Sequence, residues 1–375
     1  MLMTKLSISE TLDNIPAEQW NELAGDSNPF IQYEFLRALE TGECLHNYGW
    51  LPKYFLVHSE NNELIGAMPA YEKHNSYGEF VFDWAWADAY QRAGLHYYPK
   101  LVISIPYSPC QGPRILAKNN DPEIKTLLIK FALDFSVKNN YSSAHWLFTL
   151  DDDYKHLAQH TDLQRFDYQF HWHNNNYHNF EDFLSELTSK KRKNIKQERR
   201  KVRDQNIQIK TFNGSELSEE QWKKIYYFYT ITFMKKSGSA TLSLNFFKAI
   251  AEKLLIIFAC YNNEEVAGAI CIEGKDTLYG RHWGCFEEFD SLHFEVCYYT
   301  GIEYCIEKGL KTFEPGAQGE HKIARGFLPV KTRSAHWVAN PEFNRILKDH
   351  LQREATALES YGEDLMAASP FKNPM

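Results

Sequence analysis

Residues 313–329 concentrate side chains that can move protons and bind anions. They include Glu314, Gln318, Glu320, His321, Lys322 and Arg325. A carboxylate or an imidazole can take the proton from an amine, and a cation can hold a carboxylate or a phosphate. Glu314 is the leading candidate for a general base, and its alternative role is a structural carboxylate that caps the following loop. The candidates for substrate or cofactor binding are Gln318, His321, Lys322 and Arg325.

A strand that ends at Pro315 would place these groups at the edge of a sheet. The apolar-led run LKTF precedes Glu314, and Pro315 has no backbone N–H with which to continue a ladder. Three glycines follow, and they permit backbone conformations that other residues avoid. Because α/β proteins commonly carry their chemistry in loops at strand ends, we expect a site here. The alternative is a solvated connection without a chemical role.

A second strand-like segment, TLYGRHWGCF at residues 277–286, adds three candidates. His282 is a second candidate for the base, Tyr279 could protonate a leaving group, and Arg281 could help to bind an anion. His282 beside a tryptophan could instead be a core histidine. Tyr279 could instead have a packing role, since a tyrosine stands at the matching place in the first half of the chain.

The first half of the chain offers candidates for holding the acceptor. These are Asp83, Trp84 and Trp86, although tryptophans in such a segment also suit a core. His171 and His173 alternate with aromatic residues on a strand, so their side chains should face one side. Two histidines without a third ligand do not make a metal site, and we expect no metal.

Residues 185–206 indicate a basic helix, with nine Lys or Arg residues between Lys190 and Arg203. Like charges one turn apart destabilise a helix by about 0.3 kcal/mol per pair, so an anionic partner is the favoured interpretation. That partner would be the phosphate of a nucleotide-like cofactor or an RNA backbone, with Lys193, Lys196 and Arg200 as contacts. The alternative is a solvated helix between domains. The residues that can line its narrow apolar stripe are Leu184, Leu187, Ile195 and Val202.

Composition sets the broad class of the protein. A chain of 375 residues is long enough for two domains, and 43% hydrophobic with 24% charged residues is typical of a globular protein. The net charge of −8 argues against wholesale nucleic-acid coating, so a basic surface must be local. Neither a membrane-spanning run nor a secretory signal is expected. Seven cysteines without a CxxC pair indicate reduced thiols, so we expect a cytoplasmic protein.

The sequence repeats itself with an offset of about 202 residues. Glu18-Gln19-Trp20 matches Glu220-Gln221-Trp222, and Gly66-Ala67 matches Gly268-Ala269. Tyr77-Gly78 likewise matches Tyr279-Gly280. Matches at one offset in three places predict an internal duplication.

Each copy is expected to run strand, two helices, a hairpin, a longer strand, a helix and a strand. In the first copy we expect FVFDWAWADAY to be the long strand, residues 122–139 the helix and SAHWLFTL the last strand. Residues 98–116, which are rich in proline, are expected to form a loop-like insertion. In the second copy the helix is FEVCYYTGIEYCIEKG, with Gly309 as its C-cap. Residues 341–365 predict a C-terminal helix.

Four strings carry a resemblance to a known family. They are EFVFDWAWADAYQRAGLHYYPKLVISIPYSPCQGPRIL, FHWHNNNYHNFEDFLSELTSKKRKNIKQERRKV, YGRHWG and FEPGAQGEHKIARGFLP. They closely resemble the FemAB-like family of predicted N-acyltransferases, labelled peptidoglycan biosynthesis/recognition, in the GNAT superfamily. The resemblance implies an α/β fold with mixed sheets and two tandem GNAT-like domains. We place these at residues 1–165 and 166–375, the second carrying the basic helix and the C-terminal helix.

The resemblance also implies transfer of an acyl or aminoacyl group to an amine in a cleft between the two domains. The donor would be acyl-CoA or aminoacyl-tRNA; the Arg/Gln-x-x-Gly-x-Gly/Ala loop of acetyl-CoA-dependent GNAT enzymes is not found, which leaves the donor open. The partners would be a small-molecule or peptide-like amine acceptor and a possible tRNA, without membrane insertion. The alternative is a non-catalytic protein that recognises a cell-wall fragment or RNA. A Ser/His/Asp hydrolase is a poor third alternative, because no GxSxG nucleophile elbow is present.

Overall fold

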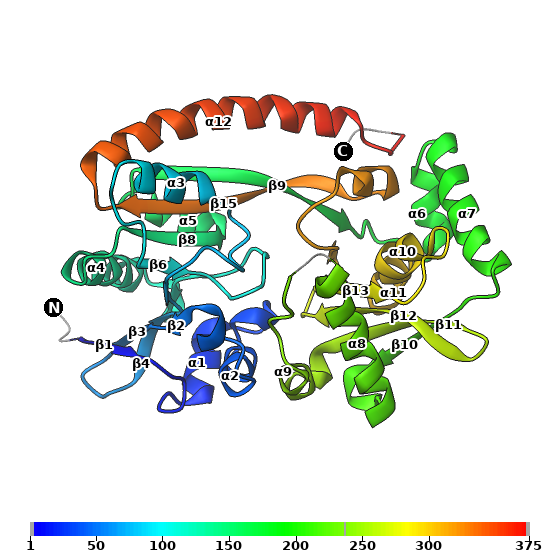
Figure 1. Ribbon diagram of the computed structural model, residues 1–375, viewed down its shortest axis with the longest axis horizontal. Coiled ribbons are helices and arrows are strands. Elements are labelled where there is room, and N and C mark those ends of the chain that lie inside the picture. The colour runs from blue at the N-terminus through cyan, green and yellow to red at the C-terminus, as the bar shows by residue number, and fades with distance from the viewer. Residues whose placement is uncertain (1–3, 236–237, 373–375) are drawn as a thin grey trace. The chain divides into compact units, whose positions relative to one another are not determined.

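The structure is a computed structural model that describes residues 4–235 and 238–372 (Figure 1). Its contacts divide the chain into two compact units. Unit 1 holds the residues up to Asp167 together with Lys331–Ser360, and unit 2 holds Tyr168–Val330 together with the residues from Tyr361 onward. The chain passes between the units within three elements, which are β9 (Leu163–His173), β15 (Leu328–Val338) and α12 (Pro341–Ala367).

Unit 1 contains two groups of paired strands. One has the order β1-β3-β4-β7, and the other has the order β15-β8-β6-β5-β2 with β6 and β8 parallel. Its elements are β1 (Lys5–Ser9), α1 (Ala17–Ala24), η1 (Pro29–Ile31), α2 (Tyr33–Thr41), η2 (His46–Tyr48), β2 (Trp50–Pro52), β3 (Tyr54–His58), β4 (Leu64–Met68), β5 (Tyr71–Lys73), α3 (Trp84–Arg92), β6 (Lys100–Ile103), β7 (Leu116–Ala117), η3 (Lys118–Asn120), α4 (Pro122–Lys138), β8 (Ser143–Thr149) and α5 (Asp151–Leu157).

The core of unit 1 lies between α4 and the strands. Leu128 and Ile129 of α4 pack with Phe55 and Val57 of β3, and every residue of β8 is buried. The helix begins where its sequence predicts, because Pro122 suits the first turn and the Asp121 side chain accepts a hydrogen bond from the Glu123 N–H. A separate apolar cluster joins α3 to α12 (Figure 1).

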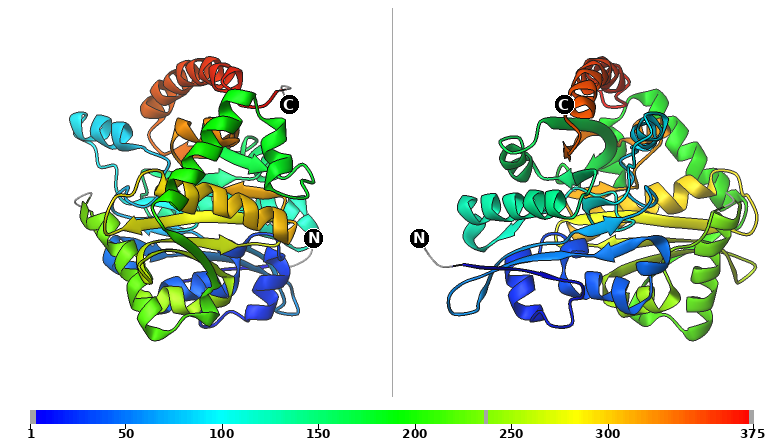
Figure 2. Two further views of the ribbon diagram at one scale, coloured as in Figure 1. Left: turned by 90° about the vertical axis from the view of Figure 1, so that its right-hand side faces the viewer. Right: turned by 60° about the vertical axis from the view of Figure 1, so that its left-hand side comes forward.

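Unit 2 contains strands in the order β10-β11-β12-β13-β14-β9, with β13 and β14 parallel. In Figure 2 the yellow strands of this unit lie between the orange α11 and the green α8. Its elements are α6 (Phe180–Glu186), α7 (Ser189–Asp204), β10 (Gln208–Asn213), η4 (Gly214–Glu216), α8 (Glu219–Lys235), α9 (Leu244–Ala249), η5 (Ala251–Lys253), β11 (Leu254–Tyr261), β12 (Glu264–Glu273), β13 (Thr277–Cys285), α10 (Leu292–Phe294), η6 (Glu295–Tyr299), α11 (Thr300–Lys308), β14 (Thr312–Glu314) and η7 (Glu320–Arg325).

Most of the expected elements are present at the expected places. The basic helix is α7, which begins at Ser189, so the continuous helix expected over residues 185–206 is interrupted at Leu187, whose backbone is extended. The four residues of the predicted apolar stripe are all buried in the core of unit 2, two of them before α7 and two on it. The C-terminal helix is α12, and Gly309 ends α11 with a φ of 68°. The predicted α/β class with mixed sheets and a C-terminal helix is confirmed.

Two expectations for the first half were wrong. The segment FVFDWAWADAY does not form a strand, because residues 84–92 are the helix α3. The strand that pairs in parallel with β8 is instead β6, within the segment that was expected to be an insertion. The proline-rich run obscured the four-residue apolar strand KLVI that precedes it.

The matched glycines of the repeat lie on corresponding strands but face opposite sides. A Cβ on Gly66 would lie 2.6 Å from Ile124 of α4, whereas one on Gly268 would lie 2.6 Å from Ile225 of α8. Val57 pairs with Gly66 in the first hairpin, and Ala259 pairs with Ala267 in the second. Between these pairs the second hairpin is therefore one residue shorter, and that shift turns the side chains of β12 to the other face relative to those of β4.

Gly284 of β13 marks the closest approach of α8 to the sheet. A Cβ at this position would lie 2.6 Å from the carbonyl carbon of Phe228, so the backbone of one element must move. We predict that Gly284→Ala lowers the free energy of unfolding in urea by about 2 to 3 kcal/mol. Gly238→Ala is the matched control, since its nearest neighbour would be 3.7 Å away. Equal stability of the two variants would contradict this packing.

Candidate active site in unit 2

A pocket of about 260 Å³ opens where β13 and β14 separate. Their parallel pairing ends at Tyr279 and Glu314. Pro315 then offers no N–H, and Gly316 turns the chain away with a φ of 94°. β13 continues to Cys285 as the partner of β12. The prediction that Pro315 ends the strand is thus confirmed, and the gap that it leaves is open.

A β-bulge in β13 sets the position of Arg281. Gly280 pairs with Cys271 of β12 and His282 pairs with Ile270, so Arg281 has no residue opposite it in the ladder. A bulge of this kind re-aims a side chain, often beside an active site. The Arg281 guanidinium lies 5.3 Å from the centre of the Tyr279 ring and 4.0 Å from a carboxylate oxygen of Glu314.

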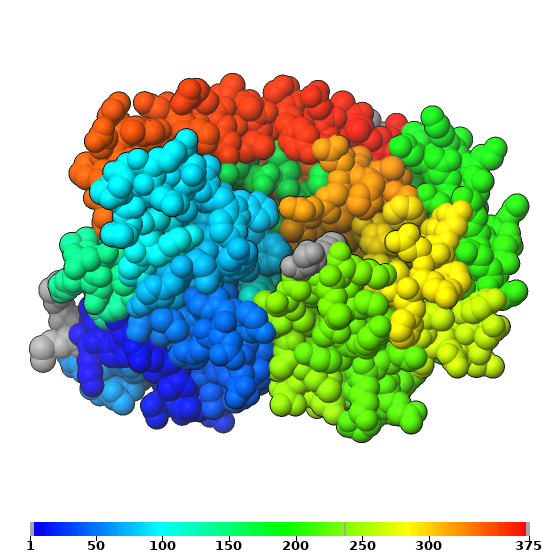
Figure 3. All heavy atoms as spheres, viewed as in Figure 1, coloured from blue at the N-terminus to red at the C-terminus, as the bar shows by residue number. Residues whose placement is uncertain are grey.

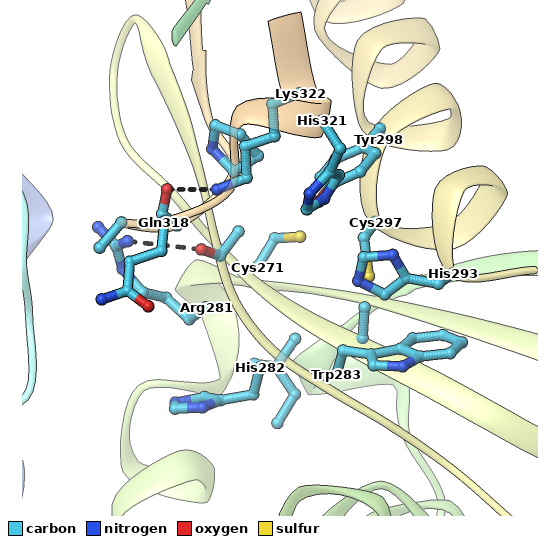
Figure 4. Close-up of a pocket in the computed structure, with 16 residues that line it drawn as sticks. Cys271, Arg281, His282, Trp283, His293, Cys297, Tyr298, Gln318, His321 and Lys322 are labelled. Atoms are coloured by element: carbon cyan, nitrogen blue, oxygen red, sulfur yellow. Dashed lines mark hydrogen bonds between the residues drawn. The ribbon is translucent and has the colours of Figure 1, made fainter. Parts of the chain in front are cut away.

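Three walls surround the pocket (Figure 4). One wall comes from β12 and β13, the second from the loop after β14 and from η7, and the third from α10 and η6. The side chains that Figure 4 labels are Cys271, Arg281, His282, Trp283, His293, Cys297, Tyr298, Gln318, His321 and Lys322. The cations among these described lining residues have no lining carboxylate beside them, so the pocket suits a carbonyl, carboxylate or phosphate group.

Tyr298 and His321 form a hydrogen-bonded pair in the pocket. The Tyr298 hydroxyl lies 2.8 Å from His321 Nε2. Burial raises the pKa of Tyr298 well above its usual range, so the hydroxyl keeps its proton. Burial, Arg325 and Lys322 lower the pKa of His321 below its ordinary value, so the imidazole is neutral at pH 7. The pair can therefore pass a proton between a ligand and the imidazole.

Lys322 places an amine in the wall opposite Arg281. Its side chain is nearly buried, and Nζ donates a hydrogen bond to the Gly316 carbonyl at 2.7 Å. Burial lowers the pKa of Lys322 to about 8, and Arg281 acts in the same direction. The amine therefore changes from cation to neutral amine just above physiological pH.

Arg325 fastens η7, which carries His321 and Lys322, to the helix α7. Its guanidinium donates to both carboxylate oxygens of Glu198, at 2.7 and 3.2 Å, and lies 3.4 Å from the centre of the Phe294 ring. It also donates to the His321 carbonyl at 2.8 Å. Fork-shaped pairing of this kind fixes orientation as well as distance. Arg325 thus holds the loop in place.

The structure brings five of the residues proposed from sequence to the pocket wall. They are Arg281, His282, Gln318, His321 and Lys322. Burial lowers the pKa of His282 to about 3, and its ring packs 4.6 Å from that of Tyr229, so it is a neutral, core-like histidine. Tyr279 and Glu314 are buried behind the wall, next to Arg281, and the described lining residues do not include them.

The remaining candidates lie away from this pocket. Asp83 and Trp86 are buried in unit 1, where Asp83 accepts hydrogen bonds from Lys100 and Tyr97. Trp84 is exposed there, with its ring 5.0 Å from that of Tyr77. On α7, in the green area at the right edge of Figure 3, the ion pairs are Lys196 with Glu181 at 2.6 Å and Arg200 with Asp204 at 3.5 Å, while Lys193 is exposed.

Sequence reasoning missed the helical wall and the anchor of the loop. His293 and Cys297 are four residues apart, a spacing that places two side chains on one helical face. That spacing was a usable signal. Glu198 is a carboxylate surrounded by cations on α7, and this isolation could have indicated a cationic partner elsewhere in the chain. Tyr298 lies in the π-helical turn η6, for which sequence periodicity gives no warning.

The corresponding gap in unit 1 is filled by the chain itself. The parallel pairing of β6 with β8 ends at Ile103 and Trp146. Gly112 then donates a hydrogen bond to the Phe148 carbonyl at 3.1 Å, so the segment after β6 occupies the space beside β8. Arg114 is fully buried in this segment and donates to the Leu147 carbonyl at 2.8 Å. The open gap therefore belongs to unit 2.

Glu198→Gln should loosen the loop that carries His321 and Lys322. The amide keeps the shape but removes the charge that holds Arg325, so we expect a loss of about 1 to 2 kcal/mol in the free energy of unfolding. Limited proteolysis after Lys322 and Arg325 should become faster. Glu181→Gln is the matched control, because its pair with Lys196 is exposed and should contribute less than about 0.5 kcal/mol. Unchanged proteolysis in Glu198→Gln would show that the pair does not hold the loop.

Neither a helix that could cross a membrane nor a metal-binding cluster is present in the described residues, 4–235 and 238–372. In that part of the chain no helix has the length and apolarity needed to cross a membrane. Nor are three or more His, Cys, Asp or Glu side chains there grouped so that they could bind a metal ion.

Three solved structures share this fold at low sequence identity. FemX has a TM-score of 0.56 at 10% identity, covering 91% of this chain and 100% of that chain. L-PGS from Bacillus licheniformis has 0.56 at 12%, covering 92% and 98%. The C-terminal domain of a putative lysylphosphatidylglycerol synthetase from Agrobacterium fabrum has 0.53 at 9%, covering 91% and 96%. These likenesses agree with the predicted tandem GNAT-like fold.

The sequence comparisons identify the family of this chain. No curated protein matches this chain. The family model described as FemAB-like, peptidoglycan biosynthesis/recognition, matches residues 11–373. Because that match spans nearly the whole chain, the protein belongs to the FemAB-like family.

Proposed function

We propose that this protein transfers an acyl or aminoacyl group to an amine and that the reaction takes place in the pocket of unit 2. The observation that carries the proposal is the open gap between β13 and β14, which sets the cations Arg281 and Lys322 beside the Tyr298–His321 pair. Acyl transfer needs a proton acceptor for the amine and positive charge for the developing oxyanion, and the lining of this pocket offers both.

The proton leaves the amine through Tyr298 and His321. A neutral imidazole is ready to take it, and the Tyr298 hydroxyl can hand its own proton to Nε2 while accepting one from the amine. Lys322, as an ammonium, and Arg281 stabilise the oxyanion, and the Gln318 amide can hold the donor. Glu314 acts through Arg281, which lies 4.0 Å away. It is a positioning residue in this scheme.

The family description favours a particular class of acceptor. A role in peptidoglycan biosynthesis points to a peptide-like amine of a cell-wall precursor. One structural neighbour is named a putative lysylphosphatidylglycerol synthetase, which favours an aminoacyl donor. Acyl-CoA and aminoacyl-tRNA both present an activated carbonyl beside a phosphate-bearing carrier. Both therefore remain candidates for the donor.

The proposal is tested by a turnover assay with the intact protein. Acyl-CoA thioesters and a charged tRNA pool serve as donors and amine-bearing peptides as acceptors, with release of free thiol or uncharged tRNA as the measurement. We expect release that depends on the amine, and His321→Gln should lower kcat/KM about 100-fold. His178→Gln on the exposed loop before α6 is the control. Amine-dependent release that is unchanged in His321→Gln would show that His321 is not the general base.

The pH profile of that turnover should be bell-shaped. His321 has a pKa below 6.5, so its neutral form is lost as pH falls through that lowered value. Lys322 has a pKa of about 8, so its ammonium is lost as pH rises through 8. In Lys322→Arg the cation persists, and the alkaline limb should move to higher pH. An alkaline limb that stays near 8 in this variant would assign it to another group.

The cationic surface of α7 is proposed to hold the phosphates of the donor. This surface consists of Lys190, Lys191, Arg192 and Lys193. The described residues provide no ion pair for these four side chains, whereas four cations further along α7 are paired. Three of the cations of this surface lie in the first turn of α7 and the fourth directly after it, at the positive end of the helix dipole, which disfavours them. A bound phosphate would relieve that repulsion.

Charge reversal on α7 tests whether the helix binds phosphates or is only solvated. We predict that replacing Lys190, Lys191 and Lys193 together by Glu weakens binding of bulk tRNA in fluorescence anisotropy. The slope of log affinity against log salt should fall by about 2 in magnitude, since each phosphate contact contributes roughly 0.7 to 0.9. Lys311→Glu, directly before β14, is the control, because its side chain is 73% exposed and pairs with Asp276. Equal salt slopes in the wild type, the triple variant and Lys311→Glu would show that α7 is a solvated helix that does not contact phosphates.

A further inference from the structure

Lys322 is unusual among the lysines of unit 2 because its amine is reached through the pocket. The residue is 3% exposed, and its side chain enters the wall between Gln318 and His321 (Figure 4). Among the described residues that line the pocket, it supplies the primary amine. Because the Lys322 amine is enclosed in this way, a reagent must enter the pocket to reach it.

The same geometry that lets Lys322 stabilise an oxyanion puts it in reach of the acyl carbon. An ammonium that donates to a carbonyl oxygen lies within about 4 Å of the carbonyl carbon, so a small movement of the amine reaches the separation of about 3 to 3.5 Å of a near-attack arrangement. Nζ is held at 2.7 Å from the Gly316 carbonyl, so its lone pair, once formed, is directed by a fixed hydrogen bond. This step rests on the proposed function, since it requires an activated acyl group in the pocket.

We propose that Lys322 is a self-modification site that takes the acyl group of the bound donor as a stable amide when no acceptor amine is present. The neutral amine attacks the carbonyl, the C–N bond forms and the bond to the leaving thiol or ribose hydroxyl breaks. The nitrogen gives up one proton, which the Tyr298–His321 pair can carry, and that proton ends on the leaving group. No oxidant or further reactant is needed.

The lowered pKa of Lys322 makes its neutral amine available near pH 8. An ordinary lysine is about 99% protonated at pH 8 and is therefore a poor nucleophile. Burial and Arg281 lower the pKa of Lys322 to about 8, so a large share of it is neutral at that pH. The group thus supports catalysis as a cation at lower pH and competes with the acceptor at higher pH.

Acylation would end turnover in the modified molecule. The amide has no positive charge for the oxyanion, and the added acyl group occupies part of a pocket of about 260 Å³. A saturating acceptor amine should protect the enzyme, because it captures the acyl group first. The protein would then lose activity with time in the presence of donor alone.

The experiment treats the full-length protein at pH 8 with the acetyl thioester of N-acetylcysteamine and follows each lysine by peptide mass spectrometry. We expect acetylation of Lys322 to be at least about ten-fold faster than that of Lys311, although the Lys311 side chain is 73% exposed. In urea-unfolded protein the two rates should become equal. Lys322→Arg should show no acetyl group in that peptide.

The outcomes separate this inference from the proposed function. Faster labelling of Lys311 than of Lys322 in the folded protein would overturn the inference, and amine-dependent turnover in the same sample would leave the transferase function standing. Labelling of Lys322 without any transfer to added amines would support the inference and count against the function. A Lys322 to Lys311 ratio that is the same in folded and unfolded protein would also overturn the inference, because the fold would then confer no reactivity.

Discussion

The site depends on the point at which β13 and β14 stop pairing. Pro315 removes the N–H that would extend the ladder, and Gly280 lets the two backbones approach closely just before they part, since a Cβ there would lie 3.3 Å from the Pro315 Cα. One strand then turns away while the other continues with an extra residue at Arg281. The separation and the bulge together create an opening between neighbouring strands, and the chemistry of the pocket follows from the side chains that line that opening.

Much of the second half could be derived from local pattern. The end of the strand at Pro315, the basic helix and the cap at Gly309 each depend on residues that are neighbours in sequence, and the structure confirms them. The positions of Lys322 and His321 in one wall also follow from the loop. The contributions of Tyr298 and Glu198 could not be derived, because they arise from a π-helical turn and from an ion pair between segments 127 residues apart.

The first half shows where pattern matching fails. Trp84, Trp86 and Tyr90 suggested the alternation of a strand, yet α3 uses Trp86 and Tyr90, four apart, to pack against α12. Short strands such as β6 leave little periodicity to detect, and tertiary pairing decides them. The repeat was detectable from letters, but a single residue lost from a hairpin reversed which glycine faces which helix. The matching residues of the repeat therefore located the duplicated strands but did not show which face of the sheet each side chain occupies.

The π-helical turn η6 fixes the angular phase between two parts of one helical segment. It holds one residue more per turn than an α-helix, and a residue removed from it would rotate the preceding part by about 100° relative to α11. Ile302 and Cys305 of α11 would stay in the core, whereas Cys297 and Tyr298 would leave the pocket wall. The length of residues 295–299 therefore matters independently of their identity. Related chains that keep every one of these side chains but lack this extra residue would not form the hydrogen bond between Tyr298 and His321.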